Sequence, residues 1–154
     1  MINAVFDRSR ADVDRVIELN KKYLNGTITD AEKAEWMSGL KGAINYTDLN
    51  RIESNCGIVA EHIAIVVQTK TWKRNDIPRV SDFLRIRNNV EKIRASYAAL
   101  STTPTTPIQP INTFQKWNDI EKILYDIDTV YHRTMDAFVY CGEDVYSGED
   151  IGVI

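Results

Sequence analysis

The segment 47–67, TDLNRIESNCGIVAEHIAIVV, carries one long apolar stripe. Its apolar residues recur three and four positions apart, which is typical of one face of an α-helix. They are Leu49, Ile52, Cys56, Val59, Ala60, Ile63, Val66 and Val67. Thr47 is a suitable N-cap, because its hydroxyl can accept a hydrogen bond from a free backbone N–H of the first turn. The segment therefore predicts a long helix of the core.

This segment also contains a four-residue motif that recurs twice: Asn, any residue, Ile or Val, then Glu. The copies span 50–53, 88–91 and 118–121. On a helix, residues three apart share a face. The Asn and Glu of each copy could therefore face the core together. A layer of polar side chains in an apolar core costs stability, but it can fix the register of the helices. We predict that six side chains make interhelical or capping hydrogen bonds in one layer of the core: Asn50, Glu53, Asn88, Glu91, Asn118 and Glu121.

Two further apolar stripes predict the other core helices. We expect core helices over residues 46–69, 81–100 and 113–140, with Ser81 capping the second and Asn112 or Thr113 capping the third. Residues 101–110 hold three prolines among threonines, which predicts an extended connector.

Two shorter helices are expected before the core. Residues 7–24 have an apolar and a polar side, and Asn25-Gly26 is a stop signal. Thr29 and Glu32 fit a capping box that opens a second, short helix. The predicted fold is therefore all-α. It has an N-terminal helical hairpin (1–44), a three-helix bundle (45–142) and a short non-helical C-terminal tail (143–154).

Size and charge limit the function classes. The chain has 154 residues, enough for one domain that needs no disulfide or metal for stability. A net charge of −3 gives no general attraction to nucleic acid or to anionic membranes. The longest apolar run, Ile63–Val67, is far too short to span a membrane. Cys56 and Cys141 form no CxxC pair, and Cys56 lies on the helical stripe, which favours a small buried hydrophobe.

The sequence contains no recognisable catalytic pattern. Glu53, Glu91 and Glu121 could supply carboxylates from three helices, but the Glu-x-x-His pattern of carboxylate metal proteins is missing. We expect His62 and His132 at surface or edge positions. No nucleophile signature and no phosphate-binding loop occurs. We therefore expect no enzyme, no cofactor, and no catalytic, cofactor-binding or metal site.

Basic residues are concentrated between 70 and 94, with Trp72 among them. A basic face with an aromatic residue is one pattern of nucleic-acid binding. Asp76, Asp82 and Glu91 interrupt it, which favours a solvated face or one that docks an acidic partner. We expect no nucleic-acid partner.

Both ends of the chain carry apolar residues that could contact a partner. They are Ile2, Val5 and Phe6 in the leader (residues 1–6), and Val145, Tyr146, Ile151, Val153 and Ile154 in the tail. Apolar residues mixed with acids suit strand addition or a groove on a partner. The alternative is that both ends are frayed. Removal of 143–154 is expected to leave the helical core folded and to weaken assembly.

A resemblance adds to these patterns. It is carried by RADVDRV (10–16), AEKAEW (31–36), LKGA (40–43) and NYTDLNRIE (45–53), and continues through DIP (76–78), the proline connector, NDIE (118–121) and YCGE (140–143). These segments resemble small proteins of tailed phages and prophages of Gram-positive bacteria. The resemblance covers nearly the whole chain and includes no catalytic residue.

The resemblance implies a structural part of the distal tail or baseplate, synthesised in the bacterial cytoplasm and located in the virion. The expected partners are other tail or baseplate proteins, in a homo-oligomer within the virion. An alternative is a prophage-encoded helical adaptor or regulator that binds a host protein. A metal-dependent enzyme is a third class, which the sequence disfavours.

Overall fold

The computed structural model describes residues 1–138. This part of the chain forms five α-helices and no strand, so the predicted all-α class is confirmed. The helices are α1 (Arg10–Leu24), α2 (Asp30–Ser38), α3 (Tyr46–His62), α4 (Val80–Ser96) and α5 (Phe114–Asp136). The five predicted partner-binding residues of the tail, from Val145 to Ile154, lie outside the described residues.

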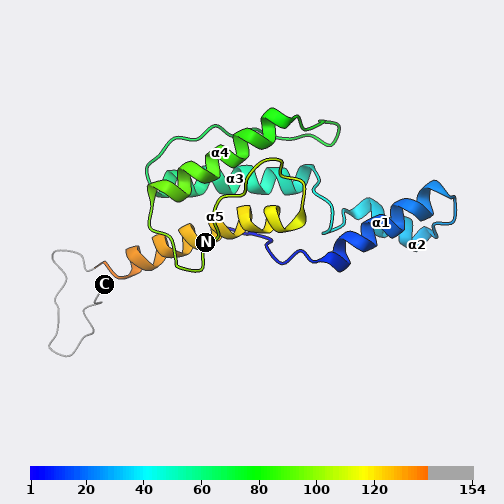
Figure 1. Ribbon diagram of the computed structural model, residues 1–154, viewed down its shortest axis with the longest axis horizontal. Helices are drawn as coiled ribbons and strands as arrows, with labels where there is room; N and C mark the ends of the chain where they lie inside the picture. Colours follow the sequence, from blue (N-terminus) through cyan, green and yellow to red (C-terminus); the bar gives the residue numbers. More distant parts are fainter. Residues whose placement is uncertain (139–154) are drawn as a thin grey trace, which may run out of the picture.

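The core lies between α3, α4 and α5, each of which packs on the other two. Figure 1 shows these three helices stacked together, with α1 and α2 extending from one end of the stack. Branched aliphatic side chains fill the core. Those with no exposed surface include Ile52, Val59, Ile86, Val90, Ile93, Ile120, Ile123, Leu124 and Ile127. Cys56 is also fully buried, as predicted, and burial raises the pKa of its thiol.

Helix α3 is shorter than predicted. Asn45 rather than Thr47 is its N-cap, and the helix ends at His62. Ala64 then takes a φ of +55°, a conformation that ends a regular helix. Beyond that point the run changes period: Ile63, Ile65 and Val67 pack on the core, while the residue between the last two, Val66, is 81% exposed. Alternation of this kind is the pattern of an extended chain. The prediction that the helix continues to residue 69 is therefore wrong beyond His62.

Helix α4 also differs at its ends. Arg79, not the predicted Ser81, occupies its N-cap position, where its backbone N–H donates to Asp82 at 2.9 Å, and the helix ends at Ser96 rather than Leu100. Helix α5 begins after Thr113, one of the two predicted caps, whose hydroxyl accepts from the N–H of Lys116.

The basic side chains of α4 hold the two connectors beside it. Arg85 and Lys92 donate to the carbonyls of Gln68 (2.9 Å) and Val66 (2.7 Å) in the connector that follows α3. On the proline connector, Arg87 donates to the Pro107 carbonyl at 3.3 Å, and Arg94 to that of Pro104 at 2.8 Å. Trp72, expected on the same face, is buried. These contacts give much of the predicted basic face an internal role.

The N-terminal hairpin, α1 and α2, has almost no core of its own. Leu19 is the one buried residue of α1, and α2 has none. Ion pairs join the helices instead, with Arg15 on Glu35 and Lys22 on Glu32. The rings of Tyr23 and Trp36 stack at 4.7 Å. The predicted capping box of Thr29 and Glu32 is confirmed.

These ion pairs make the hairpin sensitive to acid. The hydrogen bond from Lys22 lowers the pKa of Glu32 from its ordinary 4.5 to about 2. A carboxyl whose pKa is lower in the folded state stabilises that state above its unfolded value, and this contribution is lost as the pH falls. We expect the contact between α1 and α2 to loosen between pH 4.5 and about 2, measured as a change in tryptophan fluorescence, to which Trp36 of this contact contributes. The variant Glu32→Gln should lose part of this transition, and an unchanged transition in that variant would contradict the assignment.

Candidate functional site

The N-terminal segment, residues 1–9, lies along α5 and is held there by side chains. The N–H groups of Ile2, Val5 and Arg8 donate to Asp128 (2.8 Å), Glu121 (2.7 Å) and Asn118 (3.2 Å) of α5. The side-chain amide of Asn118 returns a hydrogen bond to the Arg8 carbonyl at 2.8 Å. From α3, Asn55 donates to the Asn3 carbonyl at 2.7 Å. Figure 1 shows this segment running beside the stacked helices toward α1. The N-terminal segment is therefore packed against α3 and α5 and is part of the folded structure.

The carboxylate of Glu121 is the centre of a buried ionic cluster. It has no exposed surface and accepts from Arg8 at 2.8 Å and from Arg51 at 3.0 and 2.8 Å. Arg51 also donates to Asp48 at 2.7 Å, and Arg8 lies 3.4 Å from the same carboxylate. The cluster joins the N-terminal segment, α3 and α5. Burial opposes the charge of Arg51, but its hydrogen bonds to Glu121 raise the guanidinium pKa above its ordinary value.

The first copy of the motif anchors the connector between α3 and α4. Asn50 accepts from the backbone N–H of Trp72 at 2.7 Å and donates to its carbonyl at 2.9 Å. Glu53 is buried, accepts two hydrogen bonds from Arg85, and accepts from the Trp72 indole N–H at 3.3 Å. Glu53 raises the pKa of Arg85 in turn.

The second copy does not take part in this network. Asn88 is exposed, and among residues 1–138 its amide oxygen accepts at 3.3 Å only from the adjacent Arg87. Glu91 lies 3.7 Å from Arg87 on the helix surface. The neighbouring Asn89 is the buried one, and it donates to the Gln68 carbonyl at 2.7 Å. The prediction of a single polar layer with three equivalent copies is therefore wrong for Asn88 and Glu91.

The apolar residues of the leader are covered by the chain itself. Ile2 packs against the core, and the Phe6 ring lies 5.2 Å from the ring of Tyr125. Val5 is half-buried, and its N–H is bound to Glu121. The structure thus gives the half-buried Ile2, Val5 and Phe6 intramolecular contacts, and their predicted binding of a partner stays a prediction.

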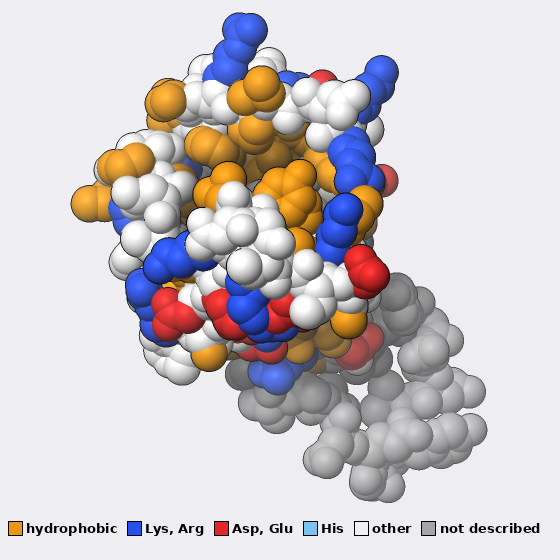
Figure 2. Space-filling view, turned by 90° about the vertical axis from the view of Figure 1, so that its right-hand side faces the viewer, with side chains coloured by type: hydrophobic (Ala, Val, Ile, Leu, Met, Phe, Trp, Pro, Cys, Tyr) orange, Lys and Arg blue, Asp and Glu red, His pale blue; other side chains and the backbone are white. Residues whose placement is uncertain are grey.

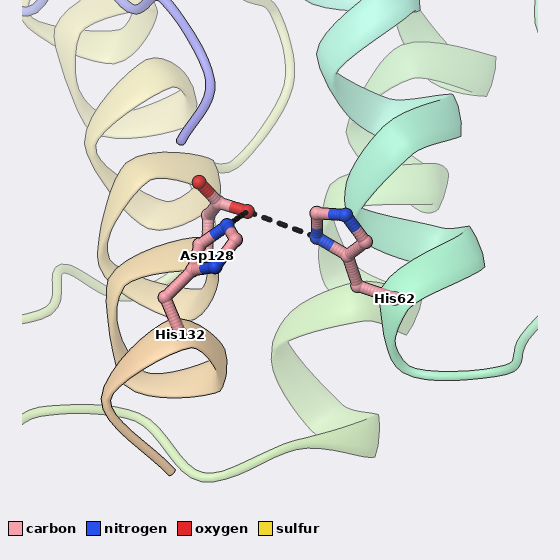
Figure 3. A group of neighbouring side chains, drawn as sticks. All are labelled: His62, Asp128 and His132. Atoms are coloured by element: carbon pink, nitrogen blue, oxygen red, sulfur yellow. Dashed lines mark hydrogen bonds and ion pairs between the residues drawn. The ribbon is translucent and has the colours of Figure 1, made fainter. Parts of the chain in front are cut away.

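Two histidines and an aspartate converge where α3 ends beside α5 (Figure 3). His62 Nδ1 lies 3.0 Å from Asp128 Oδ1, and His132 Nε2 lies 3.5 Å from the same oxygen. The three potential ligand atoms all lie within 4.8 Å of one another. Asp128 has no exposed surface, and both histidines are half-buried. We call these residues the His62–Asp128–His132 triad.

Neighbouring groups orient the triad. Asp128 uses its second oxygen, Oδ2, to accept from the Ile2 N–H at 2.8 Å. The Tyr131 ring stacks on the His62 imidazole at 4.6 Å with an interplanar angle of 8°. His132 Nε2 is buried and has no hydrogen-bond partner within the described residues. Asp128 and His132 are four residues apart on one helix, so the sequence alone predicts that they share a face. The contribution of His62 depends on how α3 and α5 pack.

The triad offers one carboxylate oxygen and two imidazole nitrogens, a ligand set that suits first-row transition metals. The same groups in another setting could transfer protons. Five surface cavities of residues 1–138 have no triad residue in their walls. The grouping of the three ligand atoms is compatible with holding an ion.

Comparison with protein-family models, with curated proteins and with solved structures gave no match. Among residues 1–138, no helix combines the length and apolar character needed to cross a membrane.

Proposed function

We propose that this chain is a structural protein of a phage tail or baseplate, where it docks other tail proteins and forms a homo-oligomer within the virion. Its location is proposed from the sequence resemblance that covers nearly the whole chain. Its role is proposed from one observation, the N-terminal hairpin that extends beyond the packed helices. In this proposal α3, α4 and α5 act as a rigid three-helix bundle, the hairpin as a docking arm, and residues 143–154 as a non-helical tail.

The hairpin exposes apolar side chains, and its attachment to the rest of the protein is at its base. Leu24 is 81% exposed and Met37 is 57% exposed. Its base is fixed because Arg8, one residue before the Ser9 cap of α1, is bound in the buried Glu121 cluster. Rigid attachment reduces the entropy that a docking surface loses on binding. An arm with one exposed apolar residue at its tip, Leu24, and another near its base, Met37, is therefore suited to contacting a neighbouring subunit.

The face around the hairpin also has hollows that a neighbour could fill. A cavity of about 690 Å³ lies where α1 and Gly42 meet the start of α5, with Val13 and Trp117 in its wall. A second, of about 420 Å³, lies between Met37, Tyr46 and Pro78. Figure 2, which faces the hairpin end, shows hydrophobic side chains gathered in a hollow with Lys and Arg at its rim. Apolar hollows with a charged rim are typical of protein interfaces.

Purified particles test the location and the role together. We expect mass spectrometry to find the chain in gradient-purified virions, in the fraction that contains tails. Leu24→Asp should reduce its incorporation about tenfold, the effect of losing one contact worth ~1.4 kcal/mol. Val66→Asp is the matched control, since Val66 is also 81% exposed but lies in the connector after α3, whereas the hairpin precedes that helix. Absence from particles, with recovery in a complex with a host protein, would support the adaptor alternative instead.

A further inference from the structure

We propose that the His62–Asp128–His132 triad binds one divalent transition-metal ion of the Zn²⁺ class. The ligands would be His62 Nδ1, Asp128 Oδ1 and His132 Nε2, with water in the fourth position. This inference is independent of the proposed tail function. It also reverses the sequence-based expectation of no metal, which rested on ligand spacing along the chain.

The geometry fits such an ion. Metal–ligand bonds of about 2.0–2.1 Å in a tetrahedron place neighbouring ligand atoms roughly 3.3 Å apart. The two distances to Asp128 Oδ1, 3.0 and 3.5 Å, lie on either side of this value. The third edge, between the two imidazole nitrogens, is within 4.8 Å. A small rotation of one half-buried imidazole would close it.

Neighbouring groups already hold two of the three proposed ligands, Asp128 and His62, in fixed orientations. Metal sites are commonly supported by hydrogen bonds that fix the ligating carboxylate and imidazoles. Here the Ile2 N–H holds Asp128 Oδ2, and the Tyr131 ring fixes the plane of His62. His132 Nε2 is buried and lies 3.5 Å from Asp128 Oδ1, but it makes no hydrogen bond among residues 1–138, so a cation would give it a bonding partner.

The position of the site gives the ion a structural consequence. It would link the last residue of α3 to α5, and through Asp128 to the start of the N-terminal segment. Ions that bind only the folded state stabilise it in proportion to their occupancy. We therefore expect the ion to hold the N-terminal segment on α5 and to raise the melting temperature.

The test uses the full chain carrying Cys141→Ser, so that this thiol cannot supply a ligand. After treatment with EDTA and its removal, the protein is titrated with Zn²⁺ by calorimetry and with Co²⁺ by visible absorption. We expect one ion per chain. Bound Co²⁺ should show the strong visible absorption of a four-coordinate ion. At a free Zn²⁺ concentration of about 100 times Kd, the melting temperature should rise by roughly 5–10 °C, and Mg²⁺ should give no rise.

Variants identify the ligands. His62→Gln and His132→Gln should each abolish the Co²⁺ absorption and the Zn²⁺-dependent rise, while their melting temperatures in EDTA stay near that of the parent because both side chains are partly exposed. Glu61→Gln is the matched control, an exposed carboxylate adjacent to His62, and should bind as the parent does. Absence of binding in the parent, or equal binding in both histidine variants, would overturn the proposal.

Discussion

Replacing Glu121 with Ala is expected to lower the free energy of unfolding by about 3–5 kcal/mol. The carboxylate has no exposed surface and is bound by Arg8, Arg51 and the Val5 N–H. Its removal leaves the Arg8 guanidinium, whose side chain is 1% exposed, without its closest charge partner. An unpaired buried charge costs far more than the pair contributes, which is why the expected loss is large. Domains of this size have a total stability of about 5–15 kcal/mol.

The repeated motif supplies a matched control for this experiment. Glu91→Ala makes the same substitution at the same motif position, but Glu91 has a 47% exposed side chain and forms one long surface ion pair. Exposed pairs of this kind contribute roughly 0–1 kcal/mol. Urea unfolding monitored by far-UV circular dichroism measures both variants. Equal losses in the two would show that burial of the Glu121 cluster has no energetic weight.

The same comparison shows how far the sequence predicts this fold. The helical class and the caps at Thr29 and Thr113 follow from local patterns, because period and cap chemistry are properties of a few neighbouring residues. The repeated motif also predicted that Glu53 and Glu121 make hydrogen bonds in the core. They could not separate Asn88 from Asn89, since one helical position decides which of two adjacent asparagines is buried, and that depends on how α4 is rotated.

The candidate metal site was less accessible to sequence reasoning. Asp128 and His132 share a helix face, but His62 precedes Asp128 by 66 residues. Its place beside them depends on where α3 ends, and the sequence pattern extended this helix past His62. The role of the N-terminal segment was missed for a related reason. Its backbone is bound by side chains of Asn118, Glu121 and Asp128, and such contacts leave no periodic trace in the segment itself.

The second large effect is expected at Gly42, where the chain leaves the hairpin for α3. A Cβ at this position would lie 2.2 Å from the Asp12 carbonyl oxygen and 2.6 Å from the Val13 nitrogen. Both are backbone atoms of the first turn of α1, so no side-chain rotation can make room. Overpacking of this kind typically costs 1–3 kcal/mol, and a backbone clash belongs at the upper end of that range. Gly42→Ala should therefore displace α1 from the junction.

Gly57→Ala provides the opposite expectation within the same protein. Gly57 lies inside α3, and an added Cβ would meet only the Thr69 methyl group at 3.9 Å, an ordinary contact. Alanine there should stabilise the chain by about 1 kcal/mol through helix propensity. We expect Gly42→Ala to lower the melting temperature and to speed proteolysis within residues 10–38, and Gly57→Ala to raise the melting temperature. If Gly42→Ala leaves both measurements unchanged, α1 is not closely packed against the junction. The inference that the base of the docking arm is fixed would then be wrong.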